Sequence, residues 1–348
     1  MASVYNDLDR PPLNEHALQR ALMVPGGFVS ALRVLPEIDS TNAALLAAAV
    51  DGAPHGSVIV AEEQTSGRGR LGRTWTAPAR SGLFLSILVR PKVPRDRLGW
   101  LPLLAGVAAQ SAVRRVAEID VSLKWPNDLI VPGEDKGAGY GAGRKLGGIL
   151  CQRGADERAS GEKPDEEGSE KFQSETFAAD KPLADKPLAD KPLADKPLAD
   201  KPLADKPLAE GEAVPDTDGV AETATVVVGI GLNVTLRADE LPAPHATSIA
   251  LAGGAVTDRE TLLRALLRDF GSCYASWVAA DGDPERSGLA DAYRAACSTL
   301  GTPVRAEMPG GAAVSGRADA IDPAGRLVVV ADDGGRMPIG AGDVVHLR

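Results

Sequence analysis

The sequence has few of the residues on which metal sites, disulfides and covalent catalysis depend. Only three cysteines and four histidines occur among 348 residues, and neither type shows CxxC or metal-ligand spacing. A disulfide framework, a zinc site and a nucleophile activated by histidine therefore explain this chain poorly. Isolated cysteines are typical of a reducing compartment, and we expect a cytoplasmic location.

Excess positive charge and long apolar segments are also lacking. The net charge is -10, which argues against a general nucleic-acid-binding surface. No long uncharged apolar run occurs and the first ten residues are polar, so we expect neither a transmembrane helix nor a signal peptide. A composition of 44% hydrophobic and 25% charged residues is typical of a globular protein.

Against this acidic background, residues 67–75 read GRGRLGRTW, a segment called the arginine loop below. Glycine permits close backbone approach to a ligand, and arginine suits bidentate contact with phosphate or carboxylate. The alternative is a solvated basic surface loop, but Trp75 is an expensive residue to leave beside one. The segment lacks the Gly-Lys-[Ser/Thr] ending of a P-loop, and its arginines do not suit the apolar helix start of a dinucleotide fingerprint.

Apolar periodicity predicts both strands and helices, with helices packing on a sheet. Strands are expected at 34–38, 57–61, 83–89, 121–125, 145–151 and 224–230, and helices at 43–50, 100–118, 258–278 and 288–300. From residue 301 onward, short strands alternate with Pro, Gly and Asp turns. This C-terminal pattern predicts a small β-barrel.

Residues 153–222 interrupt this pattern with polar, acidic sequence in which ADKPL repeats six times over 179–208. A proline every five residues blocks both continuous helix and strand ladders. We interpret the segment as a disordered insertion, and a docking peptide for a partner is the alternative. The strands on either side of it should pair as a hairpin.

Several polar clusters fall at the ends of predicted strands. Together they are rich in cations and amides and poor in nucleophiles. Such a site suits phosphoryl or nucleotidyl transfer, in which the protein positions anions and neutralises developing charge.

Five motifs, taken in order, resemble those of the biotin protein ligase family. They are DSTN at 39–42, the arginine loop, KWPND at 124–128, KLGGI at 145–149 and GIGLNV at 229–234. The resemblance implies an α+β fold, with a mixed β-sheet flanked by helices in a class II synthetase-like catalytic domain, and a C-terminal SH3-like barrel. The domains expected are an N-terminal extension (1–33), a catalytic domain (34–299) interrupted by the insertion at 153–222, and the barrel (300–348). The resemblance implies a monofunctional ligase, one without the DNA-binding domain that bifunctional members carry, because only about thirty residues precede the motifs and no helix-turn-helix pattern occurs there.

The resemblance implies the activity of a biotin–[biotin carboxyl-carrier protein] ligase (EC 6.3.4.15). Biotin and ATP, with Mg²⁺ carried on the ATP phosphates, give biotinyl-5′-AMP, and biotin then passes to one lysine of a carrier domain. The acceptor expected is the biotin carboxyl carrier domain of acyl-CoA or pyruvate carboxylases, such as acetyl-CoA carboxylase. The enzyme is expected to be a monomer or weak homodimer without nucleic-acid or membrane partners.

The resemblance also assigns residues to roles. The biotin-binding positions are Ser40, Thr41, Asn42, Gln64, Arg68, Gly69, Arg70 and Lys145. The ATP-binding positions are Arg70, Arg73, Trp75, Asn127 and Asn233. Arg70, Lys145 and Asp128 are the expected catalytic residues.

Two points stay open on sequence alone. Asp128 could act on the acceptor lysine, bind Mg²⁺ or cap the turn after Pro126. A lipoate–protein ligase and a non-catalytic biotin or nucleotide sensor remain alternative functions.

Because the insertion follows the strand that carries Lys145, it should not disturb the site. Deleting residues 160–220 is therefore expected to change the rate of carrier biotinylation by less than about twofold. Steady-state biotinylation by the shortened chain checks this prediction, and a large loss of activity would contradict it.

Overall fold

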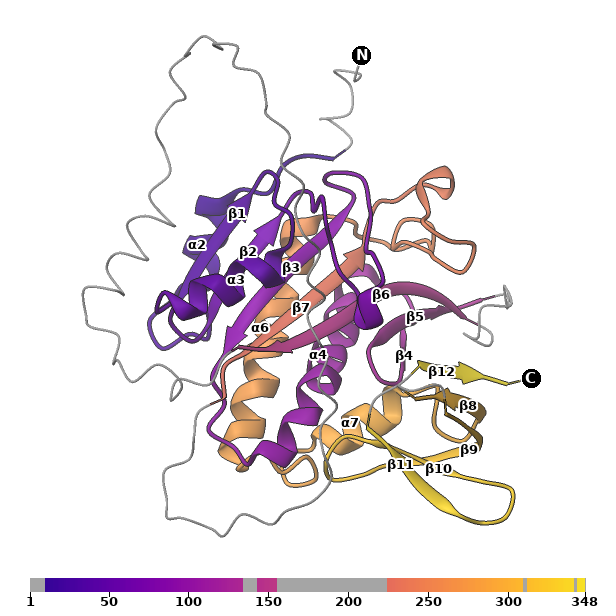
Figure 1. Cartoon of the computed structure of the whole chain (residues 1–348). Coiled ribbons are helices and arrows are strands. Elements are labelled where there is room, and N and C mark those ends of the chain that lie inside the picture. The colour runs from indigo at the N-terminus through magenta and orange to yellow at the C-terminus, as the bar shows by residue number, and fades with distance from the viewer. Residues whose placement is uncertain (1–9, 134–142, 155–223, 309–311, 341–342, 348) are drawn as a thin grey trace, which may run out of the picture.

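The computed structural model describes residues 10–133, 143–154, 224–308, 312–340 and 343–347 (Figure 1). Nearly all of the predicted insertion, from residue 155 onward, lies outside the described residues. The two strands that flank the insertion, β6 (Gly143–Arg153) and β7 (Val226–Asn233), pair in antiparallel register with Arg153 opposite Val226. The predicted hairpin is therefore confirmed, and the ends of the insertion are held side by side.

A seven-stranded mixed sheet forms the centre of the molecule (Figure 1). Its order is β1-β2-β3-β7-β6-β5-β4, with β1 and β2 parallel and the other neighbours antiparallel. This confirms the predicted mixed sheet. The remaining strands are β1 (Ala31–Leu35), β2 (Ser57–Ala61), β3 (Gly82–Val89), β4 (Ser122–Lys124) and β5 (Asp128–Pro132).

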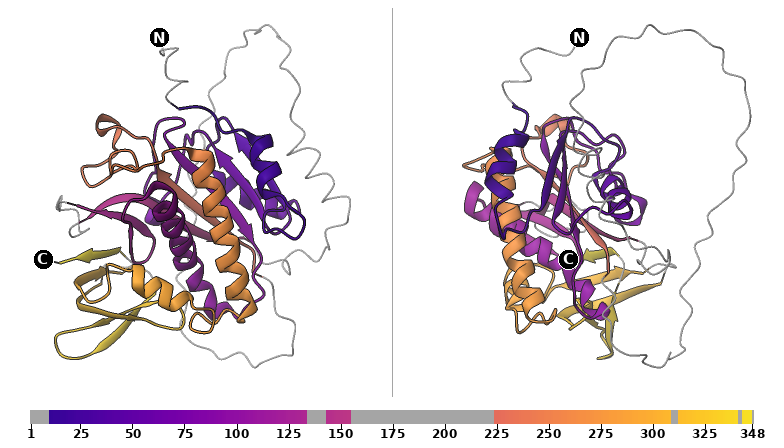
Figure 2. Two further views of the ribbon diagram at one scale, coloured as in Figure 1. Left: turned by 180° about the vertical axis from the view of Figure 1, so that it is seen from behind. Right: turned by 90° about the vertical axis from the view of Figure 1, so that its left-hand side faces the viewer.

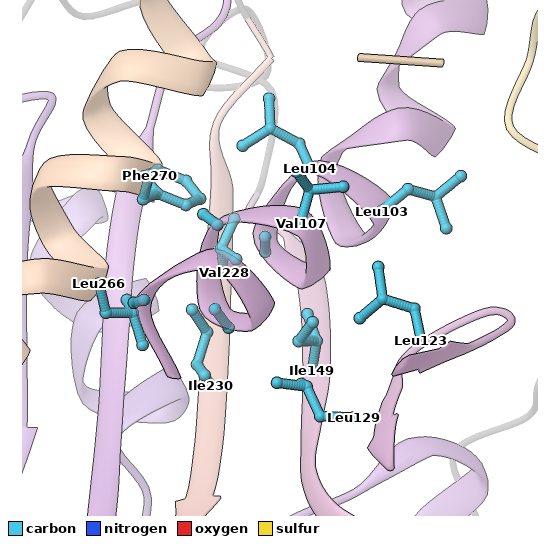
Figure 3. Packing of buried hydrophobic residues seen from close by; sticks show 14 of the residues in the cluster. Leu103, Leu104, Val107, Leu123, Leu129, Ile149, Val228, Ile230, Leu266 and Phe270 are labelled. Atoms are coloured by element: carbon cyan, nitrogen blue, oxygen red, sulfur yellow. The ribbon is translucent and has the colours of Figure 1, made fainter. Parts of the chain in front are cut away.

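Helices cover both faces of this sheet (Figure 2). Three helices, α2 (Glu15–Leu22), α4 (Leu101–Ala117) and α6 (Arg259–Ala279), share the main core with one face, and α3 (Thr41–Val50) packs on the other. Side chains alternate between the two faces along β2, because Val58 and Val60 enter the main core while Ile59 packs near Leu45 of α3. Figure 3 shows α4 leucines and Phe270 of α6 meeting the apolar face of the sheet.

The N-terminal segment contributes to this core, although its sequence shows little periodicity. Leu18 and Leu22 of α2 are buried. The same helix covers the open edge of β1, because Glu15 accepts a hydrogen bond from the Val34 amide and Gln19 donates to the Leu32 carbonyl. The edge strand is thereby shielded from pairing with another chain.

The C-terminal residues form a second, five-stranded antiparallel sheet in the order β11-β10-β9-β8-β12. This agrees with the small all-β unit expected from the turn-rich sequence. Its strands are β8 (Pro303–Glu307), β9 (Ala313–Ile321), β10 (Leu327–Val330), β11 (Arg336–Ile339) and β12 (Asp343–His346). Helix α7 (Leu289–Ala296) and three short 3-10 segments, η1 (Arg70–Gly72), η2 (Arg95–Trp100) and η4 (Ala238–Glu240), complete the described elements.

Buried hydrogen bonds fasten the C-terminal sheet to the catalytic sheet. The Lys124 ammonium at the end of β4 donates to the Val344 carbonyl of β12. The Thr299 hydroxyl accepts from the Trp125 amide at 3.0 Å and lies 3.0 Å from Nε2 of His346. Since the hydroxyl has one proton, it can donate to His346 only while the imidazole is neutral.

This arrangement predicts a pH-dependent contribution to stability. Burial, and then the charge of Lys124, lower the pKa of His346 from 6.5 to about 4. The unfolded chain therefore takes up a proton in a range where the folded chain does not, and the His346 contribution is lost as the pH falls from about 6.5 to about 4. His346→Gln should flatten the pH dependence of the free energy of unfolding in this window, measured by urea denaturation. An unchanged slope would contradict the prediction.

Within the described residues, no helix is long and apolar enough to cross a membrane.

Candidate active site

A cavity of about 540 Å³ opens between the catalytic sheet, the arginine loop and the C-terminal sheet. Every residue that the sequence assigned to the site lines this cavity. They are Ser40, Thr41, Asn42, Gln64, Arg68, Gly69, Arg70, Arg73, Trp75, Asn127, Asp128, Lys145 and Asn233. Five motifs spread over almost two hundred positions therefore meet at one place.

One wall of the cavity is the first turn of α3. Ser40 caps this helix, with its hydroxyl 3.4 Å from the Ala43 amide. Gln64, which follows β2, accepts from the Thr41 amide at 2.9 Å and contacts the Thr41 hydroxyl at 3.1 Å. Hydroxyl and amide groups here suit a neutral ligand with its own donors and acceptors.

The arginine loop folds as a narrow hairpin over the cavity. Gly67 and Trp75 are joined by a hydrogen bond from the Trp75 amide at 2.8 Å, and a Cβ at Gly67 would lie 2.4 Å from the Trp75 carbonyl. Glycine is therefore required at 67. At Gly69 an added Cβ would meet nothing closer than 3.5 Å, so this conformation does not demand glycine there.

The loop is tied to the KWPND turn across the cavity. Arg70 donates to Oδ1 of Asn127 at 3.2 Å, and Asn127 in turn donates to the Ile149 carbonyl of β6 at 3.0 Å. The Asn127 side chain thus orients Arg70 over the strands that carry the other polar residues.

Lys145 and Asp128 form an ion pair of 2.8 Å at the edge of the cavity. The Lys145 ammonium also lies 5.6 Å from the centroid of the Trp75 ring, within range of a cation–π contact. Its backbone is fixed to the segment 245–247, since its amide donates to the His245 carbonyl at 2.7 Å and its carbonyl accepts from the Thr247 amide at 2.8 Å.

The motif glycines form a flat floor beneath Trp75. Gly148 of β6 and Gly231 of β7 are register partners. A Cβ at Gly231 would lie 2.9 Å from the indole, and one at Gly148 would lie 3.3 Å from it. The indole Nε1 is buried and makes no hydrogen bond within the described part of the chain, so it suits a ligand acceptor.

Asn42 and Asn233 line the cavity but use their side chains to hold the protein together. Asn233 is 3% exposed and donates to the Thr247 carbonyl at 2.9 Å. Asn42 is 5% exposed, and its amide donates to the Leu150 carbonyl and to Gln152.

Sequence reasoning missed two contributors to the cavity. Residues 242–246 supply Pro242, Ala243 and His245, and β12 supplies Val344 and Val345. Burial, and then the charge of Lys145, lower the pKa of His245, so the imidazole is neutral near pH 7. The valines carry no chemical signal, and only the docking of the two sheets brings them to the site.

The lining is cationic and lacks an activated nucleophile. Asp128 is the one carboxylate among the described lining residues. Cys151 lies behind the floor, where burial raises its pKa to about 12, so it stays a thiol. No group of three or more His, Cys, Asp or Glu side chains that could hold a metal occurs in the described ranges. The arrangement therefore fits charge neutralisation between anions.

Comparison with known proteins identifies the family of the chain. Residues 34–161 match the model of the biotin/lipoate A/B protein ligase family, and residues 299–347 match the biotin protein ligase C terminal domain. The chain is 34% identical to the biotin--[acetyl-CoA-carboxylase] ligase of Mycobacterium tuberculosis over 97% of each chain. It is 38% identical to the Escherichia coli bifunctional ligase/repressor BirA over 36% of this chain and 35% of that protein.

The fold has a solved counterpart as well. The Aquifex aeolicus biotin protein ligase, solved in complex with biotin and ATP, superposes with a TM-score of 0.58 at 21% identity, covering 91% of this chain and 99% of that one. The full-length match to the mycobacterial ligase, together with the two family models, shows that this chain belongs to the biotin protein ligase family.

Proposed function

We propose that the chain activates biotin with ATP and transfers it to the lysine of a biotin carboxyl carrier protein of acetyl-CoA carboxylase. The observation that carries the proposal is that Arg68, Arg70, Arg73, Lys124 and Lys145 line one cavity, in which Asp128 is the single carboxylate among the described residues. Two anions must meet in this reaction, and such a lining offsets their repulsion.

In the first step, a biotin carboxylate oxygen attacks the α-phosphorus of ATP. A new O–P bond forms while the bond to pyrophosphate breaks, and the electron pair leaves with pyrophosphate. Arg70 and Lys145 neutralise the carboxylate and α-phosphate, and Thr41 and Gln64 bind the ureido ring. Trp75 and Arg73 contact the nucleotide.

In the second step, the acceptor amine attacks the acyl carbon of biotinyl-5′-AMP. The new C–N bond replaces the C–O bond, AMP leaves with the electron pair, and the amine loses a proton. Closure of the arginine loop keeps water from the mixed anhydride between the steps.

Mg²⁺ would enter this cavity with the ATP phosphates. Asp128 and Oδ1 of Asn127 are the hard oxygen donors that could share it, which suits an ion that keeps several waters and binds few protein groups. When bound, Mg²⁺ would neutralise phosphate charge.

The proposal extends to a cytoplasmic monomer or weak homodimer that could also accept the carrier domains of other acyl-CoA carboxylases and of pyruvate carboxylase. The free cysteines Cys151, Cys273 and Cys297 suit a reducing compartment.

Pyrophosphate release separates the candidate functions. The chain is mixed with ATP and either biotin or lipoate, and pyrophosphate is measured. Biotin-dependent release supports the proposal, lipoate-dependent release alone would indicate a lipoate ligase, and binding without release would indicate a sensor.

Asp128→Asn is expected to lower transfer to the acceptor by about 10²-fold while adenylation falls much less. The carboxylate is proposed to orient the acceptor amine and take its proton, a contribution of about 10²–10⁴-fold in general-base catalysis. Single-turnover pyrophosphate release measures the first step, and transfer from preformed biotinyl-5′-AMP measures the second. Asp120→Asn, a 70% exposed carboxylate paired with Arg114, is the control.

Equal losses in both steps, together with a changed Mg²⁺ requirement, would assign Asp128 to the metal instead. Unimpaired transfer would exclude the acceptor-lysine role.

A further inference from the structure

Behind the first turn of α3, a buried chain of hydrogen bonds runs from β6 to the Thr41 hydroxyl. Asn42 Nδ2 lies 3.1 Å from the Leu150 carbonyl and 2.8 Å from Oε1 of Gln152. Oδ1 of Asn42 lies 2.6 Å from the Ser86 hydroxyl, which lies 2.8 Å from the Thr41 hydroxyl. Ser86, in the interior strand β3, is fully buried.

The donor and acceptor of every hydrogen bond in this network are determined at the end that lies on β6. A backbone carbonyl can only accept, so the Asn42 atom that faces Leu150 must be the amide nitrogen. The Asn42 oxygen therefore faces Ser86, and because this oxygen can only accept, Ser86 must donate its one proton to it.

The consequence reaches the cavity wall. With the Ser86 proton committed to Asn42, the contact between Ser86 and Thr41 is a hydrogen bond only if Thr41 donates. The other nearby partner of the Thr41 hydroxyl, Oε1 of Gln64 at 3.1 Å, already accepts from the Thr41 amide and is also an acceptor. The Thr41 proton thus stays inside the protein in either orientation, and only its lone pairs remain for a ligand.

The hydrogen bonds to Leu150 and Gln152 prevent the amide of Asn42 from reversing this polarity. Gly229 of β7 lies directly beneath it, where a Cβ would come within 2.2 Å of Oδ1. Both amide hydrogens are taken up by Leu150 and Gln152.

We propose that Ser86 is a specificity-determining positioning residue that makes the Thr41 hydroxyl an obligate hydrogen-bond acceptor, so that the cavity selects a ligand with a ureido N–H at this point. The inference rests on the proposed function and adds to it a reason why one ring chemistry is accepted. A ring oxygen in place of that N–H would set lone pair against lone pair, and a dithiolane ring would leave the acceptor unpaired.

The test compares biotin with two carbamate analogues, in each of which one ureido N–H is replaced by a ring oxygen. In the unmodified chain, kcat/KM for pyrophosphate release should be at least about 100-fold lower for one of the analogues than for biotin. In Ser86→Ala the Thr41 hydroxyl loses the nearer of its two internal acceptors and keeps only Gln64 at 3.1 Å, so its proton can turn to a ligand acceptor more easily. The discrimination should then fall about tenfold, with the KM for ATP unchanged.

Three further variants control the test. Ser57→Ala removes another fully buried serine hydroxyl, one that donates to the Pro54 carbonyl away from the cavity, and should leave discrimination unchanged. Ser86→Cys keeps a weak donor and should retain most of the discrimination. Thr41→Val removes the acceptor while leaving Ser86 in place, and it tests the assignment even if Ser86→Ala does not fold.

The assignment would be overturned if discrimination by Ser86→Ala stayed within twofold of that of the unmodified chain, or if Ser57→Ala lost discrimination equally. Unchanged discrimination in Thr41→Val would also overturn it. Absence of pyrophosphate release from biotin in the unmodified chain would instead refute the proposed function, so the two failures are distinguishable.

Discussion

Replacing Lys145 by methionine is expected to lower the rate of biotin-dependent pyrophosphate release by at least about 10²–10³-fold. Removal of one preorganised charge or donor from a transition state has effects of this size. The loss should be larger here than for an isolated lysine, because the Asp128 carboxylate, 2.8 Å away, would be left facing two anionic substrates.

Single-turnover pyrophosphate release at saturating ATP checks this prediction. Lys92→Met, at an exposed position outside the cavity, is the control. Lys145→Met combined with Asp128→Asn should recover part of the lost substrate affinity, because it removes the uncompensated negative charge. If Lys145→Met released pyrophosphate within tenfold of the normal rate, the prediction would be contradicted, and the arginines alone would be enough to neutralise the carboxylate and the α-phosphate.

The second large effect is expected at Gly229. Gly229→Ala should raise the KM for biotin by at least about 100-fold, because its Cβ would lie 2.2 Å from Oδ1 of Asn42. Asn42 has little room to yield, since it is hydrogen-bonded to Leu150 and Gln152. Overpacking of this kind also costs about 1–3 kcal/mol of stability.

A graded alanine series tests the steric reasoning. The nearest atom to an added Cβ is at 2.2 Å for Gly229, 2.9 Å for Gly231 and 3.5 Å for Gly69. The loss of kcat/KM for pyrophosphate release should be largest for Gly229→Ala and smallest for Gly69→Ala. Gly231→Ala displaces Trp75 and should raise the KM for ATP more than that for biotin. A larger loss at Gly69 than at Gly229 would show that loop mobility, and not wall packing, dominates.

Motifs dense in charge and glycine were visible in the sequence because they depart from ordinary strand and helix composition. Each predicted site residue therefore proved to line the cavity. The strands and helices were also predictable, since β-branched runs and helical spacing are local signals, whereas the mixed sheet was expected only from the family resemblance.

Contacts made by ordinary residues were invisible in the sequence. Ser86 is one serine within an apolar strand, and its role depends on the register that brings β3 beside α3 and β7. The valines of β12 reach the cavity only because Lys124 and Thr299 hold the two sheets together. Asn233 is the opposite case: it belongs to a motif and was expected to contact the nucleotide, but its side-chain amide donates to the Thr247 carbonyl.

The central claim is that one cavity traps the adenylate between the arginine loop and Lys145. The measurement that tests it most directly is the amount of biotinyl-5′-AMP that stays bound after the chain is incubated with biotin and ATP and passed through a desalting column. The unmodified chain should retain close to one adenylate per chain, and Arg70→Ala should make adenylate but release it. Failure of the unmodified chain to retain adenylate, or equal retention by Arg70→Ala, would contradict the claim.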